Sequence, residues 1–218
     1  MEKNIRINQR LAELNAYCEA HTTPQSDILY QLERETYLKT LAPQMMSGHL
    51  QGQFFRLLSL LMRPKTILEV GTFTGYAAIC LAEGLPEDGI LHTIEVNAER
   101  EFLIRKYIEK AGLKDKIHLH IGDAQAVIPT IDATFDMVFL DAGKQEYKHH
   151  YDLVIDHVNP GGLIMADNVL WSGKVIDPVH DKDTEKIRAF NQLIHEDERV
   201  ENILLPIRDG IMIARKVV

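Results

Sequence analysis

The spacing of apolar residues changes near residue 64. Before that point, apolar residues recur every three or four positions, which is typical of amphipathic helices. Three helices are expected: one with Leu11, Leu14 and Cys18, one capped by Ser26 with Leu29, Leu32, Leu38 and Leu41, and one with Leu50, Phe54, Leu57, Leu58 and Leu61 that stops at Arg63-Pro64. These helices precede a region with a different pattern.

From residue 66 onward, short runs of β-prone residues alternate with helical segments. Strands are expected at 66–70, 90–95, 117–121, 135–140, 163–166, 200–205 and 211–217. Helices are expected at 76–85, from Asn97 to 111, at 149–158, and from a cap at Asp183 to 196. This alternation predicts an α/β fold with a doubly wound, Rossmann-like, seven-stranded and mostly parallel sheet.

The last two predicted strands are joined by a short loop that contains Asp209-Gly210, so a hairpin with an antiparallel last strand is expected. No repeat, low-complexity tract or linker divides the chain. We therefore expect a single domain over residues 1–218, with helices in 1–63 and the Rossmann-like core in 64–218.

Composition narrows the class of protein. The 218 residues are 45% hydrophobic and 26% charged, as in ordinary globular domains. A net charge of −8 does not favour a protein whose main task is to grip phosphate backbones. The strongly apolar stretch 57–62 is too short to cross a bilayer, and the N-terminus lacks the apolar region of a secretory signal. Cys18 and Cys80 form no CxxC, which indicates a reducing, cytoplasmic location.

Polar residues stand where the predicted strands end, and ligands of open α/β sheets bind beyond those carboxyl ends. Glu69 lies at the end of the first strand and precedes a glycine-containing turn, Gly71 to Gly75. Glycines allow a ligand to approach the backbone closely, and the following helix offers free N–H groups. The turn lacks the Gly-x-Gly-x-x-Gly fingerprint, which disfavours a nicotinamide dehydrogenase, and a tight turn without a ligand is an equal alternative.

The next two strand ends favour an adenosine ligand. Glu95 lies 26 residues after Glu69 (95 − 69), where a carboxylate typically accepts ribose hydroxyls, although it could also be a solvated acid. Asp123 and Ala124 end the third strand and could meet an adenine edge. Three such ends in succession predict an adenosine site.

The fourth and fifth strands end in Asp141 and in Asp167-Asn168. Neighbouring strands lie about 5 Å apart, so two carboxylates and an amide oxygen can converge. Such oxygen ligands suit Mg²⁺, Ca²⁺ or Mn²⁺, and the alternatives are unrelated solvated aspartates or a helix cap at Asp167. Lys144 follows Asp141 by three residues and could lie beside an oxygen bound to this metal. The adjacent residues His149 and His150 diverge on a helix, so they are expected to be solvated and not to bind one ion together.

Four segments carry a resemblance to a known family: Ile-Leu-Glu-Val-Gly-Thr-Phe-Thr-Gly-Tyr (67–76), Asp-Ala-Gly-Lys (141–144), Asp-Asn-Val-Leu-Trp-Ser-Gly-Lys-Val (167–175) and Leu-Pro-Ile-Arg-Asp-Gly (205–210). Through these segments, the chain resembles the metal-dependent class I S-adenosylmethionine-dependent O-methyltransferases of the catechol and caffeoyl-CoA type. Within this family, it resembles the short bacterial members most. The resemblance extends from about residue 40 to the end.

On the acceptor side, the resemblance implies that Asp141, Asp167 and Asn168 hold a divalent metal, Mg²⁺ or otherwise Ca²⁺ or Mn²⁺. It makes Lys144 and Asp141 the catalytic residues, and Lys144 would contact the reacting hydroxyl as base or as charge partner. Asn168 and Trp171 would contact the acceptor, with the loop 169–182 as its wall. The catechol enzymes carry a bulky residue where this chain has Gly143.

On the donor side, the resemblance implies that Glu69, the backbone of Gly71 and Thr72, and Asp141 hold the methionyl part. Glu95 would hold the ribose, and Asp123 and Ala124 the adenine. The segment 45–48 would close over the donor, with Met45 near the sulfonium and Ser47 as a backbone contact. Many members have serine where this chain has Ala77, near the donor carboxylate.

The implied activity is methyl transfer from S-adenosylmethionine to a hydroxyl of a small, vicinal-diol aromatic acceptor. A tRNA hydroxyuridine is an alternative acceptor, against which the net charge weighs. A non-catalytic S-adenosylmethionine-binding protein is a second alternative, but it has no need of the metal set together with Lys144. The resemblance and the abundant apolar residues of the N-terminal helices also predict a homodimer without a membrane partner, in which these helices contribute to the donor lid and the dimer contact.

Overall fold

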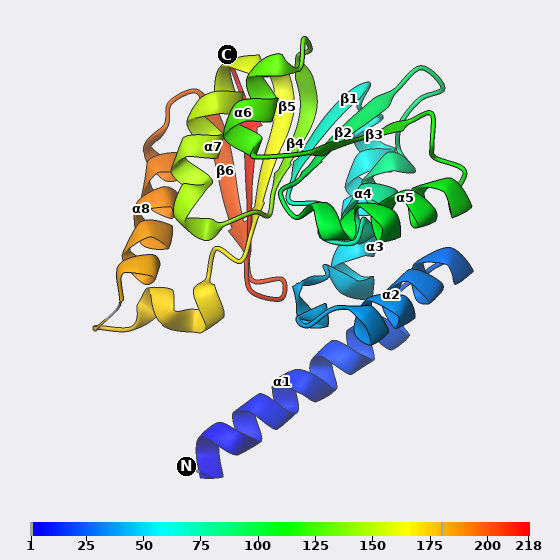
Figure 1. Cartoon of the computed structure of the whole chain (residues 1–218). Coiled ribbons are helices and arrows are strands. Elements are labelled where there is room, and N and C mark those ends of the chain that lie inside the picture. Colours follow the sequence, from blue (N-terminus) through cyan, green and yellow to red (C-terminus); the bar gives the residue numbers. More distant parts are fainter. Residues whose placement is uncertain (1, 180) are drawn as a thin grey trace.

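The computed structural model describes residues 2–179 and 181–218, with the side chains of 2–9 and 11 outside the description. Its centre is a seven-stranded sheet of order β3-β2-β1-β4-β5-β7-β6 (Figure 1). The strands are β1 Thr66–Val70, β2 Ile90–Glu95, β3 Ile117–Ile121, β4 Phe135–Leu140, β5 Val158–Asp167, β6 Val200–Leu205 and β7 Ile211–Lys216. Only β7 runs antiparallel to its neighbours, so the predicted sheet and hairpin are confirmed.

Helices cover both faces of the sheet. The helices are α1 Glu2–Ala20, α2 Asp27–Lys39, α3 Gly48–Met62, α4 Tyr76–Ala82, α5 Glu101–Lys110, α6 Ala124–Val127, α7 Tyr147–Val154 and α8 Lys182–Glu196. One core lies between the sheet and α3, α4 and α5, and contains Ile67 and Phe139. The other lies between the sheet and α6, α7 and α8, and contains Leu68 and Val138. Successive residues of β1 and β4 thus face opposite cores, as the period of a strand requires.

The first two helices lie outside these layers (Figure 1). Ser26 caps α2 as predicted, because its hydroxyl accepts the N–H of Leu29 at 3.4 Å. Leu29 and Leu32 then bury that helix against the core of α4 and α5. In the described residues, no helix is long and apolar enough to cross a membrane.

Only part of the apolar stripes predicted for the N-terminal helices faces the core. Leu29 and Leu32 of α2 are buried, and Phe54 and Leu58 of α3 pack against the core, but other members face outward. On α3, Leu57 and Leu61 are 55% and 82% exposed, while Gln51, Gly52 and Ser59 are buried. The reason is a close approach of α3 to α4: a Cβ on Gly52 would lie 2.6 Å from Tyr76. Leu14, Leu38 and Leu41 are exposed as well, and the side chain of Leu11 lies outside the described residues.

Other expected boundaries were wrong. Strand β5 begins at Val158, not at residue 163, and passes through Pro160 with an irregular register opposite β4, an arrangement that tolerates proline. Helix α7 begins at Tyr147, not at 149, and α4 already ends at residue 82. The cap of α8 is Asp181, whose carboxylate accepts the N–H of Thr184 at 2.8 Å, and not Asp183.

Candidate active site

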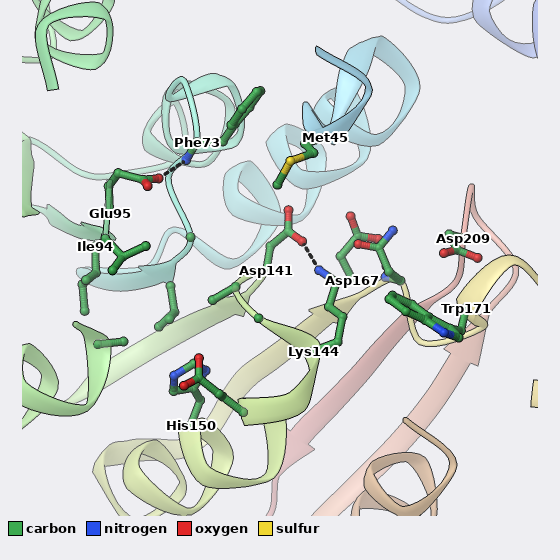
Figure 2. A pocket seen from close by; sticks show the side chains of 18 of the residues that line it. Met45, Phe73, Ile94, Glu95, Asp141, Lys144, His150, Asp167, Trp171 and Asp209 are labelled. Carbon is green, nitrogen blue, oxygen red and sulfur yellow. Dashed lines mark hydrogen bonds and ion pairs between the residues drawn. The ribbon is translucent and has the colours of Figure 1, made fainter. Parts of the chain in front are cut away.

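A cavity of ≈710 Å³ opens at the edge of the sheet where β1 to β5 end (Figure 2). Its lining includes these predicted site residues: Met45, Gly71, Glu95, Asp123, Ala124, Asp141, Lys144, Asp167, Asn168 and Trp171. A narrow second compartment shares Met45, Gly71 and Asp141 with it and adds Ser47, Thr72 and Ala77. Of the candidate residues, Glu69 lines neither space.

Glu69 lies beneath the floor of the cavity. It is on the same face of β1 as Ile67 and is fully buried. Its Oε2 accepts a hydrogen bond from Thr93, while Oε1 is buried without a partner. Burial raises the pKa of Glu69 to about 8, and the nearby Asp141 and Glu95 carboxylates add to the rise. A cationic group that reached this carboxyl would satisfy its unpaired oxygen.

The turn after β1 needs glycine at position 71. Gly71 has a φ of +103°, and a Cβ there would overlap the carbonyl oxygen of Asp141. The N–H groups of Gly71 and Thr72 both donate to the carbonyl oxygen of Ile94, at 3.0 and 3.2 Å. These two N–H groups are therefore already used within the protein, and a donor molecule would have to bind other groups of this turn.

Glu95 is held at the cavity wall by groups of the protein. Its Oε2 accepts the N–H of Phe73 at 2.8 Å, as Figure 2 shows. Its Oε1 accepts the N–H of Asn97 at 2.8 Å and Nη1 of Arg100 at 3.0 Å. A carboxylate has about four lone-pair positions, so room remains for about one ribose hydroxyl rather than two.

We expect Glu95→Ala to weaken the binding of S-adenosylmethionine about tenfold or more, since a hydrogen bond to a charged group contributes about 1.5–3 kcal/mol. Glu95→Gln keeps the shape of the side chain. As a matched control, Glu99→Ala removes an exposed acid four residues further along the chain. Titration calorimetry measures the affinities. An unchanged affinity of the Glu95 variants would remove this residue from the donor site.

The third strand end also has a structural role. Asp123 is exposed, and its carboxylate accepts the N–H of Gln125 at 2.8 Å, which caps α6. The N–H of Gly122 donates to the carbonyl oxygen of Glu95 at 2.9 Å. The ends of β2 and β3 are thereby joined, and Ala124 is buried behind them at the same wall.

Asp141, Lys144 and Asp167 face the part of the cavity between Met45 and Trp171 (Figure 2). Lys144 Nζ lies 2.6 Å from Asp141 Oδ1, and both side chains are largely buried. Burial raises the pKa of Asp141 to about 6; the Lys144 ammonium opposes this rise and the Asp167 carboxylate adds to it. The two acids are therefore close enough to interact, and Lys144 forms an ion pair with Asp141.

Asp167 and Asn168 form a tight turn at the end of β5. Asp167 is 2% exposed, and its Oδ1 accepts the N–H of Asn168 at 2.7 Å. Asn168 has a φ of +58°, a left-handed conformation that asparagine tolerates. The following helical turn begins only at Trp171, so Asp167 is not its cap.

The carboxylates of Asp141 and Asp167 and the amide oxygen of Asn168 are the groups that could hold a divalent cation. Within residues 2–179 and 181–218, no three His, Cys, Asp or Glu side chains form a group that could hold a metal ion. A cation would therefore use two carboxylates and complete its shell with the amide, waters or the acceptor. The donor set fits a hard cation, and the predicted metal stays a prediction.

Sequence reasoning was wrong about His150. Its side chain is 1% exposed and lines the cavity, with Nδ1 unpartnered and its pKa lowered by burial, whereas His149 is exposed. The signal was present in the sequence: adjacent helix positions diverge by about 100°, so one histidine of such a pair faces inward on a packed helix.

The loop after β5 and the β6–β7 turn form the remaining wall, which sequence reasoning covered only in part. Trp171 lines the cavity as expected, and Arg208 and Asp209 were missed. Asp209 Oδ1 accepts the N–H of Ser172 at 2.5 Å, and its carbonyl oxygen accepts that of Leu170 at 2.8 Å. The hairpin thus holds the loop that carries Trp171.

The sheet order and the cavity at its carboxyl edge define the class as the Rossmann-like methyltransferases. Among solved structures, the chain is similar to the SAH-bound methyltransferase PaMTH1 of Podospora anserina, with a TM-score of 0.88 and 27% identity over 96% of each chain. It is also similar to an O-methyltransferase of Bacillus cereus in complex with SAH, with a TM-score of 0.86 and 29% identity over 94% of this chain and 97% of that one.

Sequence comparison identifies the family. A family model described as O-methyltransferase matches residues 19–217. Caffeoyl-CoA O-methyltransferase 1 of Arabidopsis thaliana is 34% identical over an alignment of 222 positions. The match covers 88% of this chain and 86% of that protein. The chain belongs to the O-methyltransferase family and is an S-adenosylmethionine-dependent O-methyltransferase, so the predicted family is confirmed.

Proposed function

We propose that the protein methylates a hydroxyl of a small, vicinal-diol aromatic acceptor, and that a divalent cation held by Asp141, Asp167 and Asn168 assists the reaction. The observation that carries this proposal is the presence of two largely buried acids, Asp141 and Asp167, beside Lys144 in one cavity. Burying carboxylates is costly unless cations compensate them. Lys144 forms an ion pair with Asp141, and the more distant Arg208 guanidinium also lowers the pKa of Asp141. Among the described residues no such ion pair is found for Asp167, which leaves a site suited to a further cation.

A divalent cation at this site would supply Lewis acidity, which lowers the pKa of an acceptor hydroxyl. A phenol has a pKa of about 10, so a lowering of about 3 units suffices at neutral pH. Lys144 Nζ stands beside Asp141. As a neutral amine it would take the proton of the hydroxyl, and as an ammonium it would stabilise the oxyanion by its charge. Asp141 orients the Lys144 side chain, and Asp141 lines the narrow compartment as well.

The donor side is proposed to hold S-adenosylmethionine along the ends of β1, β2 and β3. Glu95 would accept a ribose hydroxyl, and Asp123 and Ala124 would border the adenine. The buried, unpaired Oε1 of Glu69 fits the ammonium of the methionyl part. Met45, which lines both spaces, would face the methyl donor, with Ser47 and Ala77 behind it in the narrow compartment. Alignment of the donor with the acceptor oxygen contributes much of the rate.

The acceptor side is proposed to lie between Lys144, Asn168 and Trp171. An indole ring and an oxygen-rich corner favour a flat acceptor with adjacent hydroxyls. The test incubates the protein with S-adenosylmethionine, Mg²⁺ and a panel of catechols, hydroxycinnamoyl esters and tRNA. Methylation of a vicinal-diol aromatic compound supports the proposal. Methylation of tRNA alone, or donor binding without transfer to any member, would contradict it.

A homodimer is also proposed, with the outward apolar residues of α1 to α3 as the contact. These exposed residues are Leu14, Tyr17, Tyr30, Tyr37, Leu38, Leu41, Leu57, Leu60 and Leu61. A second copy with the same surface would remove them from water. Sedimentation should show a particle of twice 24.9 kDa at micromolar concentration, and Leu61→Asp should weaken it. A monomer at that concentration would contradict the proposal.

A cytoplasmic location completes the proposal. Cys18 is an exposed free thiol and Cys80 a buried one, which fits a reducing compartment. Cell fractionation tests the location, and recovery of the protein outside the cytoplasm would contradict it.

A further inference from the structure

Arg208, in the turn between β6 and β7, reaches across the cavity edge to the segment that precedes α3. Its Nη1 donates to the carbonyl oxygen of Ser47 at 2.5 Å and to Oε1 of Gln51 at 2.7 Å. Its Nη2 donates to the carbonyl oxygen of Gln44 at 3.4 Å. These acceptors are neutral, and no ion pair of Arg208 is found in the described part of the chain. The guanidinium lowers the pKa of Asp141 through its charge, but its hydrogen bonds go to residues that lie 157 to 164 positions earlier in the sequence.

The segment 41–47 has few other fixed points. Leu41 and Met45 are 106% and 53% exposed, and no side chain caps the 3-10 turn Pro43–Met45. The N–H groups of Met45 and Met46 return to carbonyl oxygens inside the segment. For the described residues, the hydrogen bonds that tie 41–47 to a distant part of the sequence come from Arg208. Losing this side chain would leave mainly the buried Met46 and Ser47 to hold the segment.

The same segment encloses the donor side of the site. Gln44 and Met45 line the main cavity, and Met45 lies opposite Asp141 in Figure 2. Met45 and Ser47 also line the narrow compartment together with Gly71. The position of this wall therefore depends on a side chain from the far end of the chain.

We propose that Arg208 is a positioning residue for the methyl donor. From the β6–β7 turn, its side chain holds residues 44–47 in place beside the narrow compartment. Arginine suits this task because its planar guanidinium presents several N–H donors in a fixed fork, whereas the ammonium of lysine is a single point. Asp209 holds the Trp171 loop from the same turn, so adjacent residues set the donor and the acceptor wall separately. The inference rests on donor binding at this site and is independent of the metal and the acceptor.

The test compares Arg208→Ala and Arg208→Gln with Arg208→Lys and with the control Arg215→Ala. Arg215 lies on β7, 3.7 Å from Glu201 and away from the cavity lining. SAH titration and amide hydrogen exchange are measured without acceptor or metal. We expect Arg208→Ala and Arg208→Gln to weaken SAH binding about tenfold or more, and to speed exchange in 41–47. Arg208→Lys should restore part of both, and Arg215→Ala should change neither.

A kinetic measurement separates positioning from catalysis. With an acceptor that is turned over, the KM for S-adenosylmethionine should rise about tenfold in Arg208→Gln, while kcat at saturation changes by less than about threefold. Unchanged affinity and exchange would overturn the inference. A lower kcat or a higher acceptor KM with an unchanged donor affinity would also overturn it. If Arg208→Ala does not fold, Arg208→Gln and Arg208→Lys decide. Absence of acceptor turnover in the unaltered protein, while that protein binds SAH, would instead count against the proposed acceptor.

Discussion

Replacing Lys144 with methionine is expected to lower kcat about 100-fold or more, the scale of a positioned acid–base group. Methionine keeps the length and the apolar stem of the side chain but removes the ammonium that lies 2.6 Å from Asp141. The acceptor hydroxyl then loses its proton acceptor or charge partner. S-adenosylmethionine affinity should barely change, because the proposed donor contacts lie mainly at the ends of β1, β2 and β3, whereas Lys144 follows β4. Steady-state kinetics and calorimetry measure the two effects.

Lys148→Met is the matched control for this experiment. Lys148 stands one helical turn further on in α7, is 65% exposed and pairs with Asp152 at 2.6 Å. Loss of the Lys148 ammonium should change kcat by less than about twofold relative to the unaltered protein, since exposed ion pairs contribute about 0–1 kcal/mol. Normal turnover of Lys144→Met at saturation, together with lost donor binding, would move Lys144 from the acceptor to the donor.

Replacing Asp167 with alanine is expected to abolish metal-dependent turnover, by about 100-fold or more, while donor binding persists. Asp167 lines the main cavity but not the narrow donor compartment, and it supplies one of only two carboxylates of the proposed cation site. Asp141→Ala should reduce both turnover and donor affinity, because Asp141 lines both spaces. Activity at a series of Mg²⁺ concentrations, beside donor titrations, separates these effects.

Two further variants keep this comparison interpretable. Asp167→Asn retains an oxygen for the N–H of Asn168 and removes only the charge, so it tests the charge without loosening the turn. Asp177→Asn changes an exposed acid outside the cavity lining and should leave the Mg²⁺ response unaltered. Full activity of both Asp167 variants at every Mg²⁺ concentration would exclude Asp167 from the cation site.

The location of the site could be predicted from the sequence because parallel strands present their carboxyl ends at one edge. Glu95, Asp141 and Asp167 each end a strand, so their gathering follows from the order of the elements alone. Glu69 differs from these three residues because it does not line the cavity. It lies one residue before the end of β1, so the period of two turns it toward α3, α4 and α5, beneath the cavity.

The orientation of α3 could not be predicted from hydrophobicity. Its leucines form a convincing apolar stripe, yet the packed face carries Gly52, because only a glycine lets α3 approach Tyr76 and Cys80 so closely. Such a contact depends on a partner 24 residues away (76 − 52), which periodicity does not include. The exposed leucines then become surface that a second chain can cover.

The position of Arg208 and Asp209 beside the site could have been predicted from the sequence, but the two residues were assigned only to a hairpin loop. Because β7 runs antiparallel to β5 and β6, the carboxyl end of β6 lies at the same edge as those of the parallel strands. The loop between β6 and β7 must therefore border the site. Which groups its side chains contact follows only from the structure.

The most direct test of the account is metal removal and restoration with an identified hydroxyl acceptor. The protein is treated with EDTA, freed of the chelator, and assayed for methyl transfer with and without Mg²⁺, Ca²⁺ or Mn²⁺. SAH binding is measured on the same samples, so that a loss of fold is recognised. The account predicts that chelation stops transfer, that Mg²⁺ restores it, and that SAH binding survives throughout. Transfer at the full rate by the chelated protein would contradict the account, and Lys144 would then act without a cation.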